Sequence, residues 1–139
     1  MTGRHDGGLA AYEEHDVLGM SPGRRVVFMY SMLLANLRQA GRALQAGEIE
    51  RRGRCLFKAQ EIVQELLFAL DRKVGGALGD RLAAIYAYFG GELLAIDRRP
   101  DAARLERLVA QVKPLYESWE AAARIAPGAS AGAGGIGVA

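Results

Sequence analysis

Residues suited to metal binding and nucleophilic catalysis are scarce in this chain, which has one cysteine and two histidines among its 139 residues. Cys55 cannot form an internal disulfide, so we expect a protein of the reducing cytoplasm. His5 and His15 both precede the first helical segment, and no helix therefore carries the histidine that a di-iron or phosphotransfer bundle needs. We expect no catalytic residue, no metal site and no cofactor, which argues against an enzyme.

A strong excess of one charge and a long apolar run are also missing. The 18 basic and 16 acidic residues leave a net charge of +2, whereas a dedicated nucleic-acid binder usually has a stronger positive bias. No stretch of about 18 uninterrupted apolar residues occurs, and the N-terminus has no apolar signal-peptide segment. We therefore expect neither nucleic-acid binding nor membrane insertion.

Glycine is abundant, with 18 residues, and many of them lie near the two ends of the chain. Glycine-rich sequence gains little burial to offset the entropy lost on ordering. We expect a flexible N-terminal segment at 1–20, a folded domain at 21–124 and a disordered Gly/Ala-rich tail at 125–139.

Inside the folded domain, apolar residues recur every three or four positions, which is the period of an amphipathic helix. The stripes cover residues 26–44, 56–70, 82–96 and 105–119, and none shows the alternation typical of a strand. Short connections between long helices make neighbouring helices antiparallel. The predicted fold is all-α, an antiparallel up-down-up-down four-helix bundle.

Capping residues place the helix ends. Ser21 followed by Pro22 predicts the start of the first helix, and Gly47 predicts its end in the left-handed conformation. We expect Asp80 to cap or open the third helix, and Arg99-Pro100-Asp101 to begin the fourth.

The apolar stripes are broader than a core seam requires. A surface groove would explain the surplus, and so would the wide face of any globular helix. The surplus residues are Leu67, Phe68, Tyr88, Leu94, Val109 and Tyr116. Gly90-Gly91, in the third helix, either is a tolerated imperfection or leaves a shallow groove that another helix can approach.

Arginines gather at two helix ends, in Arg51-Arg52-Gly53-Arg54 and in Arg98-Arg99. Acidic neighbours and the lack of interleaved aromatics favour solvated helix ends over a nucleic-acid site. A helical regulatory or nucleic-acid-binding module using these arginines is the alternative function, and a self-associating structural bundle is a third.

Residues 58–89 carry a spaced pattern that has a known counterpart. It consists of Lys58-Ala59, Ile62, Glu65-Leu66, Leu70-Asp71, Gly75-Gly76 and Ile85-Tyr86-Ala87-Tyr88. The pattern resembles that of the flagellar secretion chaperones, which bind flagellin in bacteria. Ser21-Pro22, Met29-Tyr30 and Trp119 extend the resemblance over about residues 11–122. Four places depart from the family pattern: Ser31-Met32, Ala87, Gly90-Gly91 and Ile96-Asp97.

The resemblance implies a cytoplasmic chaperone, without a nucleotide cofactor, that holds the disordered C-terminal segment of flagellin before export. The flagellar export gate and an anti-sigma factor are further candidate partners. Flagellin is expected to lie along the second and third helices, with help from the fourth. The predicted flagellin-binding residues are Tyr12, Ile62, Leu66, Tyr86, Tyr88, Leu93 and Leu94. By the same resemblance, Tyr12 is expected to cover the groove as a displaceable plug when flagellin is absent.

Overall fold

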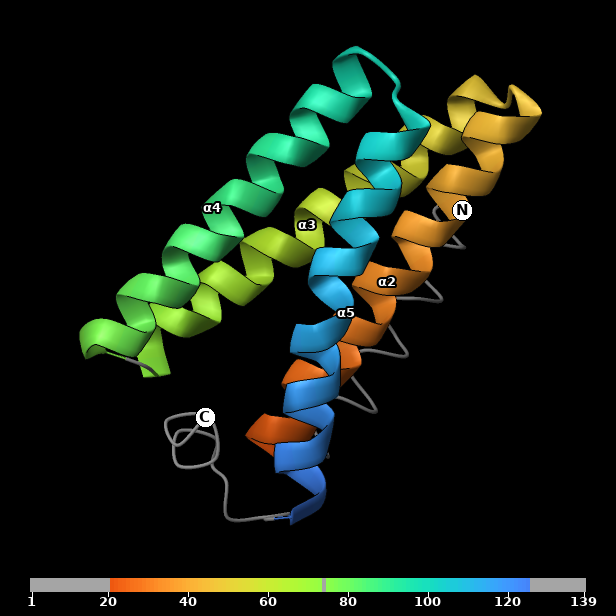
Figure 1. The fold of residues 1–139 in the computed structure, drawn as a ribbon. Helices are drawn as coiled ribbons and strands as arrows, with labels where there is room; N and C mark the ends of the chain where they lie inside the picture. Colours follow the sequence, from red (N-terminus) through yellow and green to blue (C-terminus); the bar gives the residue numbers. More distant parts are fainter. Residues whose placement is uncertain (1–20, 74, 126–139) are drawn as a thin grey trace, which may run out of the picture.

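The computed structural model describes residues 21–73 and 75–125, and within these ranges the chain forms four long α-helices and no strand. The helices are α2 (Pro22–Ala46), α3 (Ile49–Lys73), α4 (Gly76–Arg98) and α5 (Ala102–Ile125). Successive helices run in opposite directions (Figure 1). The predicted all-α four-helix bundle is therefore confirmed. The terminal segments predicted to be flexible lie outside the described residues, except for Ile125, the last residue of α5.

Both ends of α2 have the predicted caps. The Ser21 side chain accepts a hydrogen bond of 3.2 Å from the backbone N–H of Arg24, and Pro22 is the first helical residue. Gly47 has a φ of 73°, in the left-handed region that favours glycine. Its N–H donates to the carbonyl of Leu44, so a helix carbonyl without an intrahelical partner is satisfied.

The start of α4 differs from the prediction. The helix begins at Gly76, so Asp80 lies inside the first turns and does not open the helix. Gly75 is the N-cap and provides no side-chain hydrogen bond, which is why the sequence gives no capping signal there. For α5 the prediction holds, because the Asp101 carboxylate accepts from the backbone N–H of Arg104 at 3.1 Å.

One continuous apolar core joins the four helices. Helix α2 packs closely against α3 and α5, and α4 packs mainly against α3. Among helices that follow each other in the chain, α4 and α5 are in least contact. In Figure 1, α4 and α5 diverge from the turn that connects them. Among the described residues, no helix is both long enough and apolar enough to cross a membrane.

Candidate functional site: the outer face of α3 and α4

Four of the predicted flagellin-binding residues lie in the core. Ile62 and Leu66 on α3 are buried, as are Tyr86 and Leu93 on α4. Their side chains hold the two helices together and against the rest of the bundle. None of them forms an open surface in this structure, so a ligand would reach them only if the bundle opened.

Tyr88 and Leu94 are the two predicted residues on the surface, with exposed fractions of 47% and 54%. Each is close in sequence to a predicted residue that is buried, Tyr88 to Tyr86 and Leu94 to Leu93. Consecutive helical residues are turned by about 100° around the axis, so Tyr88 lies nearly opposite Tyr86, and Leu94 is turned away from Leu93. The remaining predicted residue, Tyr12, lies outside the described residues.

Two exposed aromatic residues on α3 complete the apolar surface. Phe57 is 64% exposed and Phe68 is 57% exposed. They are three helical turns apart and lie on the same side of α3, opposite its buried stripe. Phe68 belongs to the predicted apolar surplus, whereas Phe57 does not. The sequence did indicate that Phe57 is on the surface. The adjacent Leu56 occupies the core stripe, and the 11-residue spacing from Phe57 to Phe68 places both on one side of the helix.

A hydrogen bond fixes how α3 and α4 are aligned. Gln60 Nε2 donates to the carbonyl oxygen of Gly90 at 3.0 Å. Because the helices are antiparallel, this contact brings Phe57, one turn before Gln60, alongside Leu94, one turn after Gly90. Both lie on the side of this contact that faces away from the core.

The residues of α4 next to these side chains are small. Ala83 is half-buried and Ala87 is exposed. A Cβ atom added to Gly91 would meet nothing within 4 Å, and one at Gly90 would lie 3.5 Å from Gln60 Oε1. We call the surface formed by Phe57, Phe68, Ala83, Ala87, Gly90 and Leu94 the α3–α4 outer face. It combines three small residues of α4 with three large apolar side chains that are more than half exposed.

Polar contacts bridge α4 and α5 where these helices diverge. Arg104 donates to both carboxylate oxygens of Glu92, from Nε at 2.7 Å and from a terminal nitrogen at 2.9 Å. The hydrogen bonds and charge of Arg104 lower the pKa of Glu92 below its ordinary value of 4.5. Tyr88 donates its hydroxyl hydrogen to Gln111 at 3.1 Å. These two bridges hold α4 in place beside α5.

A buried aromatic cluster links α4 to the opposite half of the bundle. The hydroxyl oxygens of Tyr30 and Tyr86 are 2.8 Å apart and share a hydrogen bond. Trp119 stacks on Tyr30 with ring centroids 6.3 Å apart. Burial raises the pKa of Tyr30 and of Tyr86 above the ordinary value of 10.0, so both stay protonated and hydrogen-bonded at neutral pH.

The residues that could bind a metal or act as a nucleophile are few in the part of the chain that the structure describes. Within residues 21–73 and 75–125, no cluster of three or more His, Cys, Asp or Glu residues could hold a metal ion. Cys55 is buried. Arg51 of the first arginine cluster pairs with Glu48 at 3.0 Å, as expected of a solvated helix end.

Comparison with known proteins identifies the family. The family model described as "Flagellar protein FliS" matches residues 6–126. The flagellar secretion chaperone FliS of Bacillus subtilis (strain 168) is 29% identical over 126 residues, which cover 91% of this chain and 93% of the relative. That of Salmonella typhimurium is also 29% identical, over 88% of this chain and 93% of the relative. The flagellar secretion chaperone FliSB of Pseudomonas aeruginosa is 27% identical over 77% of this chain and 85% of the relative. The chain therefore belongs to the FliS family of flagellar secretion chaperones.

Proposed function

We propose that this protein is a non-enzymatic cytoplasmic chaperone that binds the disordered C-terminal segment of flagellin, prevents its premature polymerisation and helps to deliver it for export. The observation that carries the proposal is the α3–α4 outer face, in a chain whose family match extends over residues 6–126. Three large apolar side chains, those of Phe57, Phe68 and Leu94, are more than half exposed there. Isolated exposed apolar residues are ordinary, but a cluster aligned on two helices is typical of a binding surface.

The shape of this face suits an amphipathic helix. A helix can lie over Ala83, Ala87 and Gly90 because their small side chains permit a close approach. Phe57 and Leu94 would then contact one part of its apolar side and Phe68 another part, several turns away. A disordered segment that folds in this way loses conformational entropy but buries a large apolar surface. In the bound state, the apolar side of flagellin is unavailable for contacts with other flagellin molecules.

Calorimetry with the C-terminal segment of flagellin tests this proposal. The double variant Phe57→Ala/Leu94→Ala should weaken binding by about tenfold or more, because a few side chains near the centre of an interface carry most of the binding energy, about 2 kcal/mol or more each. Ile125→Ala is the matched control, since Ile125 is an exposed apolar residue on α5. Flagellin without its C-terminal segment should not bind. Undiminished binding of the double variant, or of truncated flagellin, would contradict the proposal.

Salt dependence separates this function from the arginine-based alternative. Burial of apolar side chains should respond little to added salt, whereas binding through phosphates weakens by orders of magnitude. The export gate and an anti-sigma factor remain proposed partners in addition to flagellin.

Tyr12 is proposed to cover the binding face when flagellin is absent. A tethered tyrosine has a high effective concentration at the surface, and a ligand must displace it. Tyr12→Ala should leave flagellin affinity equal or higher and make the free chaperone more prone to aggregation. A large loss of affinity would instead show that Tyr12 contacts flagellin directly.

A further inference from the structure

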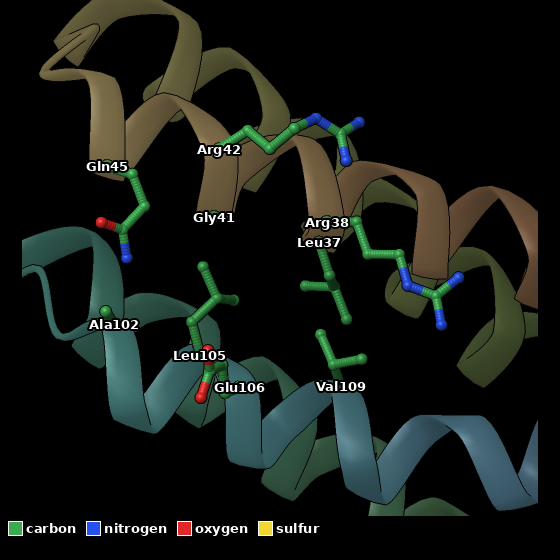
Figure 2. Close-up of a pocket in the computed structure, with 9 residues that line it drawn as sticks. All are labelled: Leu37, Arg38, Gly41, Arg42, Gln45, Ala102, Leu105, Glu106 and Val109. Atoms are coloured by element: carbon green, nitrogen blue, oxygen red, sulfur yellow. The ribbon is translucent and has the colours of Figure 1, made fainter.

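A second groove lies between α2 and α5, and no residue of α3 or α4 lines it. Its volume is about 300 Å³. Three apolar residues are among those that line it: Leu37 and Leu105, which are buried, and Val109, which is half-buried. Figure 2 shows Leu105 pointing from α5 toward Gly41 on α2, and Val109 pointing toward Leu37. The volume is at the small end of ligand pockets. It suits one large anchoring side chain better than a cofactor.

Gly41 keeps the α2 wall of this groove low. The residue lies in the middle of a helix, where glycine is less stable than alanine. Packing does not require glycine there, because an added Cβ would lie 3.7 Å from Leu105 Cδ2, an ordinary contact distance. The lack of a side chain at Gly41 therefore keeps the α2 wall of the groove low, whereas core packing gives no reason for a glycine at this position.

The α2 wall of the groove is positively charged. Arg38 and Arg42 are exposed and lie one helical turn apart. Neither forms an ion pair with another described residue. Several other arginines do pair with a glutamate: Arg24, Arg51, Arg104 and Arg124. Glu106 stands on the opposite wall, on α5. Charge therefore differs across the groove, positive along α2 and negative along α5.

We propose that the α2–α5 groove binds an amphipathic segment of a second protein, with one large apolar side chain and carboxylates on the side that faces α2. The apolar side chain would enter the groove between Gly41 and Val109, both of which are half-buried. Carboxylates of the segment would pair with Arg38 and Arg42, because a guanidinium forms strong, paired hydrogen bonds with a carboxylate. Glu106 would repel acidic side chains on the α5 side and so set the orientation of the segment.

A protein segment fits this groove better than a nucleic acid does. The lining residues include no aromatic side chain on which a base could stack, and they include the apolar Leu37, Leu105 and Val109. Because the groove and the α3–α4 outer face share no residue, both can be occupied in the same complex. The second partner could therefore bind the chaperone while flagellin is held.

A designed peptide tests the proposal. The probe is a fluorescein-labelled amphipathic helix with glutamates along one side and a leucine beside them, and its binding is followed by fluorescence anisotropy. It should bind the full-length chaperone, and Arg38→Glu/Arg42→Glu should weaken binding by about tenfold or more. A matched peptide with lysines in place of the glutamates should bind Arg38→Glu/Arg42→Glu more tightly than the wild type. Gly41→Met, which fills the groove, should also weaken binding. Arg81→Ala removes an exposed arginine on α4 and should change nothing.

Other outcomes would overturn the proposal. These are no binding of the acidic peptide, equal binding to the arginine variants, or displacement of the peptide by single-stranded DNA at moderate salt. Thermal denaturation shows whether each variant is folded. Flagellin binding by Arg38→Glu/Arg42→Glu should equal that of the wild type, so failure of this proposal is distinguishable from failure of the flagellin-binding proposal.

Discussion

The inner and outer sides of α3 and α4 have similar side chains but different surroundings. Leu93 is 1% exposed and its neighbour Leu94 is 54% exposed. The inner side contacts the core, whereas the outer side includes Phe57, Phe68 and Leu94, all more than half exposed. Apolar residues of one helix can therefore have separate roles, the inner ones in stability and the outer ones in binding. Four predictions test this division, and the largest effects are expected on the inner side.

Leu93→Ala should destabilise the protein by about 2–5 kcal/mol, because it removes a fully buried side chain and leaves a cavity. Leu94→Ala is the matched control and should change the free energy of unfolding by less than about 0.5 kcal/mol. Urea denaturation followed by Trp119 fluorescence measures both. Equal effects of the two substitutions would contradict the division between inner and outer sides.

Tyr30→Phe should destabilise the protein by about 1–3 kcal/mol, because the buried hydroxyl of Tyr86 loses its hydrogen-bond partner. Tyr86→Phe should have a similar effect. The double variant should cost less than the sum, since it leaves neither hydroxyl unpaired. Denaturation of all four proteins forms a double-mutant cycle. Additive losses would show that the two hydroxyls do not stabilise each other.

A smaller effect is expected at the bridge between α4 and α5. The pKa of Glu92 is lowered in the folded protein, so its stabilising contribution is present above the ordinary value of 4.5 and is lost as the pH falls through the folded-state pKa. Glu92→Gln should remove this part of the acid dependence and reduce the effect of salt on the melting temperature. Glu61→Gln, at an exposed ion pair within α3, is the control. Identical acid and salt profiles for wild type and Glu92→Gln would refute the prediction.

Periodicity and capping residues predicted the fold well, because helix ends and apolar stripes depend on local sequence. Ser21, Gly47 and Asp101 act at the predicted ends. The predicted start of α4 was wrong, because the helix begins at Gly76 after the N-cap Gly75, and neither glycine has a side chain that could signal a helix start.

The binding surface was harder to predict, because a broad apolar stripe does not show where the core ends. Tyr86 and Tyr88 belong to one sequence pattern, yet one is buried and the other is exposed. They are turned by about 200° from each other around the helix, and the contact of Tyr86 with Tyr30 shows which of the two faces the core. Phe57 was missed although the helical period of α3 places it opposite the buried stripe.

Photo-crosslinking tests most directly whether flagellin lies on the outer side of α3 and α4. The photoreactive residue p-benzoylphenylalanine replaces Phe57, Leu94 or, as a control, Ala35, an exposed residue on α2. All three positions are exposed, so the fold should tolerate the change. On irradiation with the flagellin C-terminal segment, positions 57 and 94 should form cross-links and position 35 should not. Cross-links at position 35 with none at 57 and 94 would contradict the account.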